Sequence, residues 1–136
     1  MELLIVTGMS GAGKTQAANA LEDIGFYCAD NIPPLIIPTL TDLLGSEDSD
    51  FKKLAIITDI RGGELFSDIT EILDTLKTKS VPYKVLFLTA KDDVLIRRYK
   101  ENRRLHPLCN KNDITISEAV EKERKMLKKI RDISDL

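Results

Sequence analysis

The segment GMSGAGKT, residues 8–15, carries residue types at a spacing that binds a chain of phosphates. It matches G-x-x-x-x-G-K-[ST], in which glycines let several backbone N–H groups close around phosphate oxygens without a clashing Cβ. Lys14 supplies a positive charge for the β- and γ-phosphates, and the Thr15 hydroxyl is a ligand for Mg²⁺. We therefore predict a nucleoside triphosphate site, with ATP or GTP as ligand, formed by Gly8, Met9, Ser10, Gly11, Ala12, Gly13, Lys14 and Thr15.

A carboxylate for the same metal ion follows the apolar run Leu54–Ile57. Asp59 stands where this predicted strand ends, which is the position of a Walker-B acid. We predict that Thr15 and Asp59 hold Mg²⁺ and that Lys14 and Asp59 act in catalysis. The alternative is that Asp59 only caps the next turn, with Arg61 as a surface partner.

An arginine cluster lies further along the chain, in the segment RRYKENRR of residues 97–104. At helical spacing Arg97 and Arg104 share one face, whereas Arg98 falls on the face of Asn102, so an arginine pair could close over the phosphates as a lid. Guanidinium groups stabilise a phosphoryl group during transfer. We predict catalytic roles for Arg97 and Arg104; the alternative is a solvated helix end held by salt bridges.

These residues need a scaffold, and the apolar pattern predicts one. Short apolar runs indicate strands at 3–6, 26–29, 54–57 and 85–88, of which the first and the third are expected to be buried. Helices are expected at 14–24, at 33–44 with an irregular first half at Pro38, at 65–76 and at 92–104, the last of these capped by Asp92 or Asp93. A capping box, Thr115 to Glu118, opens a final helix that places Ile116, Val120, Leu127 and Ile130 on one face. This alternation predicts a three-layer α/β fold, P-loop NTPase/kinase-like, with a mainly parallel sheet of four to five strands.

The composition restricts the class of protein. The chain has 136 residues, of which 43% are hydrophobic, and a net charge of −2. These values predict one globular domain, residues 1–136, and exclude a disordered chain and a protein that coats nucleic acid generically. No apolar run approaches the ~18 residues of a membrane helix, so we expect a soluble cytoplasmic protein with no membrane partner. Cys28 and Cys109 lack the spacing of a metal or redox pair, and the single histidine, His106, argues against a zinc site.

Charge is distributed unevenly along the chain. Residues 1–83 carry a net charge of −7 and residues 84–136 a net charge of +5. The basic half predicts either a surface that meets phosphates or an acidic partner, or solvated helices that are rich in lysine.

Four motifs together, GMSGAGKT, LEDIGFYCADNIPP, TDIRGG and LIRRYKENRRLHPL, resemble the RapZ/YvcJ family of bacterial P-loop nucleotide-binding proteins, known as RNase adapter proteins. The resemblance spans essentially the whole chain. It implies binding and hydrolysis of ATP and GTP, and in some members presentation of small RNAs to a ribonuclease in the control of amino-sugar synthesis. It assigns Gly8 to Thr15 to ATP, and Asp59, Ile60, Arg61 and Gly62 to GTP. Because Asp59 would not serve both a metal ion and a guanine edge, we favour the metal role, which its position predicts independently.

Length separates this chain from the family it resembles. Family proteins are roughly twice as long, with a C-terminal domain associated with RNA binding, metabolite sensing and oligomerisation. We therefore expect an N-terminal domain, in which Asp135 and Leu136 lead into a further strand whose absence leaves a sheet edge open. An RNA or ribonuclease partner and an oligomer are expectations for the full-length protein.

Three functions stay open on these residues. The leading one is a regulatory domain that binds nucleoside triphosphate with Mg²⁺ and hydrolyses it weakly. The alternative is a small-molecule kinase in which Asp30, after the second strand, binds the acceptor, although Asp30-Asn31 is also ordinary turn chemistry. The third is a non-catalytic nucleotide switch for RNA or protein partners.

Overall fold

Four parallel strands form the sheet of this computed structural model, which describes residues 2–9, 11–44, 52–59, 63–101 and 115–136. The strand order is β2-β3-β1-β4, so the strand that leads into residues 8–15 lies in the interior of the sheet. The four strands are β1 (Glu2–Gly8), β2 (Tyr27–Ala29), β3 (Lys53–Ile57) and β4 (Tyr83–Leu88). They confirm the predicted α/β fold and its parallel sheet.

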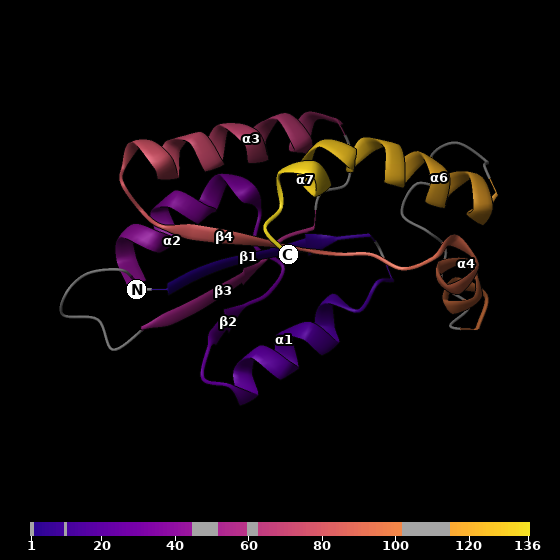
Figure 1. Cartoon of the computed structure of the whole chain (residues 1–136), viewed down its shortest axis with the longest axis horizontal. Coiled ribbons are helices and arrows are strands. Elements are labelled where there is room, and N and C mark those ends of the chain that lie inside the picture. The colour runs from indigo at the N-terminus through magenta and orange to yellow at the C-terminus, as the bar shows by residue number, and fades with distance from the viewer. Residues whose placement is uncertain (1, 10, 45–51, 60–62, 102–114) are drawn as a thin grey trace.

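Helices cover both faces of the sheet (Figure 1). Alternate residues of β1 face opposite sides of the sheet. Leu4 and Val6 pack toward α1 (Lys14–Asp23), and Leu3 and Ile5 belong to the larger of two hydrophobic cores, on the other face. That core joins the sheet to α2 (Ile37–Leu44), α3 (Gly63–Thr78), α6 (Ile116–Met126) and α7 (Lys128–Ile133). Because β1 is buried on both sides, its sequence is a continuous apolar run rather than an alternating one.

α4 (Asp92–Glu101) lies beyond the carboxyl end of β4, beside α6 (Figure 1). Leu95 is fully buried and joins α4 to the larger core. α4 therefore stands at the edge of the sheet where residues 8–15 begin.

Two predicted helices differ in detail from those observed. The segment expected as one helix from Pro33 to Leu44 starts as a 3-10 turn, η1 (Pro34–Ile36), before α2 begins, which agrees with the expected irregular first half. The final helix is not continuous: it divides at Leu127, whose backbone leaves helical geometry with ψ of 1°. Leu127 and Ile130 are both about 1% exposed, so packing on the core decides where the helix turns.

The outer edge of β4 pairs with residues 135–136, where the sequence predicted an open edge. Asp135 N and Leu136 N donate to Val85 O at 2.9 and 3.2 Å, and Phe87 N donates to Leu136 O at 3.1 Å. The Asp135 carboxylate accepts from Val85 N at 2.8 Å. The bonds flanking Leu136 have the parallel pattern, so these two residues extend the sheet in the direction of its other strands.

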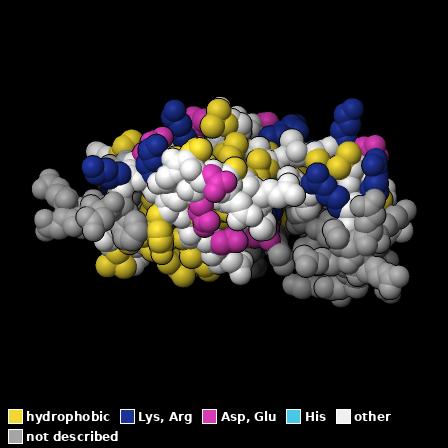
Figure 2. Space-filling view, turned by 90° about the horizontal axis from the view of Figure 1, so that it is seen from below, with side chains coloured by type: hydrophobic (Ala, Val, Ile, Leu, Met, Phe, Trp, Pro, Cys, Tyr) yellow, Lys and Arg dark blue, Asp and Glu magenta, His cyan; other side chains and the backbone are white. Residues whose placement is uncertain are grey.

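The face of the molecule on the α1 side has a segregated surface. Figure 2 shows acidic side chains near its middle, and hydrophobic side chains gathered toward one end. Large exposed hydrophobic residues include Tyr27 on β2, at 49% exposure, and Leu35 in η1, at 66%. Among the described helices, none combines the length and apolar character that a membrane crossing requires.

Candidate functional site

The segment of residues 8–15 is attached to the sheet through Gly8. A Cβ placed on this residue would lie 2.1 Å from the carbonyl oxygen of Leu88, because β1 and β4 pair here without space for a side chain. Met9 N then donates to the same Leu88 oxygen at 2.9 Å. The start of the loop is therefore fixed by the backbone of β4.

The rest of the loop delivers the chain to the N-terminus of α1. Gly11 and Gly13 have φ of +82° and +99°, the left-handed region that favours glycine, and Ala12 N donates to Met9 O at 3.1 Å. α1 begins at Lys14. The first N–H groups of a helix have no carbonyl partner one turn earlier, and the helix dipole makes this end positive. These features are the ones that the predicted anion site requires: glycines in left-handed conformations and a helix N-terminus directly after them.

Lys14 lies between the loop backbone and the end of β3. Its Nζ donates to the carbonyl oxygens of Gly8 and Met9, at 3.0 and 3.4 Å, and lies 3.7 Å from Asp59 Oδ1. The two charged side chains are only 14% and 19% exposed. The structure thus brings Lys14 and Asp59 together, as their positions at neighbouring strand ends suggest.

The oxygen groups beside this loop suit a magnesium ion. The Asp59 carboxylate stands at the end of β3, where Thr58 N donates to Val6 O at 2.9 Å, and Thr15 is the second residue of α1, with an exposed side chain. Mg²⁺ prefers oxygen ligands and usually takes one or two from the protein, with the others from phosphates and water. No group of three His, Cys, Asp or Glu side chains placed for a metal occurs among the described residues. This donor set therefore fits an ion that arrives with a phosphate chain.

Two buried hydroxyls near this site were not found from the sequence. The Thr7 and Thr58 side chains are fully buried, and neither Oγ1 has a hydrogen-bond partner within the described part of the chain. Each threonine directly follows the last register pair between β1 and β3, Val6 with Ile57. The only signal in the sequence is a polar residue at the end of an apolar run.

Of the two lid arginines that the structure describes, Arg97 and Arg98, it is Arg98 that contacts the loop. Arg98 Nη1 donates to the carbonyl oxygen of Gly11. Arg97 is 64% exposed, and its Nη2 lies 4.0 Å from Asp93 Oδ2, one turn earlier on α4. Burial of Leu95 determines which face of α4 meets the core and hence which arginine meets the loop. Arg104 lies outside the described residues.

Other predicted site residues have simpler surroundings or are not described. Ser10, Ile60, Arg61 and Gly62 lie outside the described residues. Asp30 is exposed, and its carboxylate accepts from the backbone N–H of Asn31 at 2.7 Å, while Asn31 has φ of +58°; this is the predicted turn. Next to it, burial raises the pKa of the Cys28 thiol, and the nearby charges of Glu22 and Asp30 raise it further. Cys28 is therefore a neutral thiol at neutral pH rather than a nucleophile.

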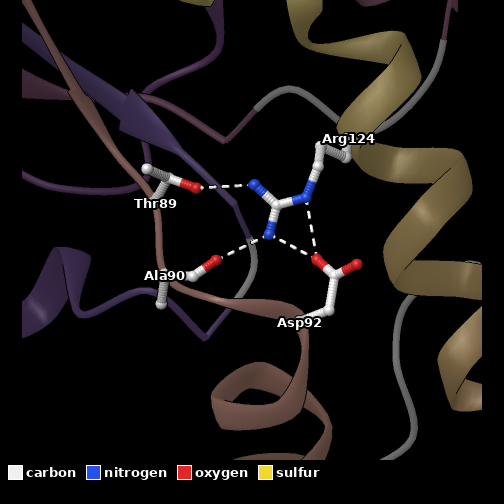
Figure 3. Close-up of polar contacts among 4 residues, drawn as sticks. All are labelled: Thr89, Ala90, Asp92 and Arg124. Atoms are coloured by element: carbon white, nitrogen blue, oxygen red, sulfur yellow. Dashed lines mark hydrogen bonds and ion pairs between the residues drawn. The ribbon is translucent and has the colours of Figure 1, made fainter.

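A polar cluster around Arg124 was also missed (Figure 3). Its guanidinium donates to Thr89 Oγ1 at 2.9 Å, to Ala90 O at 2.6 Å and, through two nitrogens, to Asp92 Oδ1 at 2.8 and 2.6 Å. Asp92 was predicted as a helix cap; it is the first residue of α4, and its carboxylate binds Arg124. More than thirty residues separate the partners, so no local pattern in the sequence indicates the cluster.

Solved structures with the same fold include two of low sequence identity. The shikimate kinase from Acinetobacter baumannii, in complex with shikimate, has a TM-score of 0.59 and 18% identity, with 98% of this chain and 80% of that chain covered. The tunicamycin resistance protein of Deinococcus radiodurans has a TM-score of 0.58 and 15% identity, with 93% and 80% covered. The likeness concerns the fold.

Sequence relatives are much closer. A protein of Caldicellulosiruptor bescii named "Nucleotide-binding protein" is 47% identical over 135 residues, which cover 99% of this chain and 46% of that protein. A protein of Moorella thermoacetica with the same name is 52% identical over 132 residues, covering 95% and 44%. The chain thus spans about half the length of these relatives. Residues 1–136 match the model of the RapZ-like N-terminal domain, and the chain belongs to that family.

Proposed function

We propose that this domain binds a nucleoside triphosphate, ATP or GTP, together with Mg²⁺ and hydrolyses it slowly, as the regulatory part of a larger protein. The observation that carries the proposal is the position of the Lys14 ammonium, 3.0 Å from Gly8 O and 3.7 Å from the Asp59 carboxylate, at the N-terminus of α1. Relatives named "Nucleotide-binding protein" support the same ligand class.

The residues of the loop divide the work of holding the phosphates. The N–H groups at the start of α1 bind phosphate oxygens, and the Lys14 ammonium exchanges its carbonyl partners for the β- and γ-phosphates. Thr15 and Asp59 hold Mg²⁺, which neutralises developing charge on the phosphates when bound. The resemblance assigns the segment 59–62 to GTP. In this proposal Asp59, the first residue of that segment, binds Mg²⁺ instead.

Arginine charge completes the site. Arg98 already contacts the loop at Gly11, so we assign to it the phosphate-neutralising role that helical spacing assigned to Arg97. Arg104 keeps the lid role predicted for it. Adapter activity toward small RNA and a ribonuclease, oligomerisation and a cytoplasmic location are proposals for the full-length protein, because the relatives are about twice as long as this chain.

Replacement of Lys14 tests the proposal. In Lys14→Ala the phosphates lose one charged hydrogen-bond donor, so the dissociation constant for Mg²⁺-triphosphate, measured by isothermal titration, should rise about ten- to hundredfold. Lys128→Ala removes an exposed lysine on α7 and is the matched control. Unchanged affinity in Lys14→Ala would contradict the proposal.

Assays of the unaltered protein with and without an acceptor distinguish hydrolysis from kinase activity. Release of phosphate by the unaltered protein with no acceptor present supports the hydrolase. Asp30 is exposed at the carboxyl end of β2, where a kinase would bind its acceptor. Consumption of triphosphate only after addition of a metabolite that carries a hydroxyl group would favour the kinase.

A further inference from the structure

We propose that Arg124 is a positioning residue: it fixes the connection between β4 and α4 and thereby holds Arg98 against the phosphate-binding loop. The effect on nucleotide affinity rests on the function proposed above. The effect on the loop itself does not, so the two ideas can fail separately.

The connection between β4 and α4 meets the loop at both ends. At its start, Leu88 O accepts from Met9 N at 2.9 Å. Only three residues, 89–91, separate this strand end from α4, and less than two turns into the helix Arg98 donates to Gly11 O. Any change in the direction of α4 therefore moves Arg98 relative to a loop whose base is fixed.

Arg124 binds this short connection at three positions (Figure 3). It donates to the Thr89 hydroxyl, to the Ala90 carbonyl and to the Asp92 carboxylate, at 2.6 to 2.9 Å. The planar guanidinium can serve all three because its donors point in fixed directions, whereas a lysine ammonium is a single point charge. The arginine side chain is 28% exposed but that of Asp92 is 55% exposed, so water screens their ion pair. The contact with the connection therefore depends on the hydrogen bonds to Thr89 and Ala90 as well.

α6, which carries Arg124, has more buried side chains than the described part of α4, whose first residue Arg124 contacts. On α6, Ala119 and Val120 are at most 1% exposed, and Leu127 directly after it is equally buried. Among the α4 side chains that the structure describes, Leu95 alone is buried. Ile96 is partly buried against the same core, so few apolar contacts hold α4. Polar contacts add to them, and the Arg124 cluster is a group of such contacts at the start of the helix.

The first test uses the ligand-free protein. We expect Arg124→Ala to shift the backbone amide NMR signals of Gly11 and Gly13 in the same direction as Arg98→Ala does. In the double variant, the signals should match those of Arg98→Ala, because Arg124 acts on the loop through Arg98. Lys125→Ala, which removes the exposed neighbour of Arg124, is the control and should leave the loop signals in place. If the NMR signals of the loop do not change in Arg124→Ala, the inference is wrong, whether or not the domain binds nucleotide.

The second test measures affinity in the same variants. Arg124→Ala should weaken binding of Mg²⁺-triphosphate about three- to tenfold, and Arg124→Lys should recover part of the loss. In the Arg98→Ala background Arg124→Ala should have no further effect. If the losses of affinity in the two single variants add up in the double variant, the inference is wrong, because Arg124 then affects binding independently of Arg98. Should Arg124→Ala fail to fold, Asp92→Asn removes the charge pair with α6 intact, and the same two outcomes decide.

Discussion

Gly8 is the residue at which the loop and the sheet constrain each other most closely. The backbone of β4 occupies the space in which a side chain would stand, and φ of +149° adds a conformation that L-residues rarely adopt. Gly25, which ends α1, also has positive φ, at +100°, but no atom lies within 4 Å of a Cβ placed there. A comparison of the two glycines therefore distinguishes the cost of a steric clash, which only Gly8 would have, from the cost of a positive φ, which both would have.

Gly8→Ala should lower the free energy of unfolding by about 3 kcal/mol or more, because the two strand backbones must move apart. Gly25→Ala should cost only the left-handed conformation, about 1–2 kcal/mol. Urea unfolding of both variants measures the difference. Equal losses would mean that β1 and β4 separate easily at this point.

The proximity of Lys14 and Asp59 could be predicted from the sequence because each residue is positioned by a local rule. The lysine follows from the glycine pattern, and the aspartate follows from the end of an apolar run. Arg98 could not be chosen over Arg97 in this way, since adjacent residues on a helix differ only in which face packs inward. That choice is made by Leu95 and the core, which depend on distant parts of the chain.

At the scale of elements, apolar runs predicted the four described strands to within a few residues. β1 and β3 are buried on both faces and carry no competing polar pattern, whereas β2 and β4 are only partly buried. The second strand is shorter than expected, Tyr27–Ala29 without Phe26, because the Phe26 N–H donates to Leu21 O in the last turn of α1, at 2.9 Å. The break at Leu127 was not predicted. No glycine or proline marks it, and only the packing of Leu127 and Ile130 against the core determines it.

The start of α6 provides a test at this scale. Thr115 Oγ1 accepts from the N–H of Glu118 at 3.2 Å, which is one half of the predicted capping box. Thr115→Ala should therefore lower the free energy of unfolding by about 1 kcal/mol, and Thr115→Ser should lose less.

Thr75→Ala is the matched control for that measurement. The Thr75 hydroxyl donates to Glu71 O inside α3 and is exposed, so its removal should be neutral or stabilising. If urea unfolding shows no greater loss in Thr115→Ala than in Thr75→Ala, the cap does not stabilise α6.

For the whole molecule, the positive charge of residues 84–136 is partly used within the domain. Arg97, Arg124 and Arg131 each lie within 4.0 Å of an aspartate oxygen, and Lys125 pairs with Glu121. The acidic partners lie in the same half of the chain, so its net charge of +5 already includes them. Solvated helices and a surface for phosphates or RNA therefore both stay predictions.

A ligand that binds only the folded domain should stabilise the whole molecule. At a concentration of Mg²⁺-triphosphate about 100 times the dissociation constant, the gain is about 2.7 kcal/mol, which raises the melting temperature by several degrees. Differential scanning calorimetry measures the shift. Omission of Mg²⁺ should reduce it, and the ten- to hundredfold weaker binding expected for Lys14→Ala should reduce the gain to about 0.4–1.4 kcal/mol at the same ligand concentration. An equal shift in Lys14→Ala would place the ligand elsewhere on the protein.

The junction between positions 8 and 88 consists of main-chain atoms on the side of β4. The atoms that crowd Gly8 are the oxygen, nitrogen and carbonyl carbon of Leu88, which every amino acid possesses. Position 88 can consequently exchange its side chain without altering the junction, whereas any side chain at position 8 forces the two strands apart. Methods that infer spatial proximity from correlated substitutions would therefore register nothing at one of the tightest contacts in the domain.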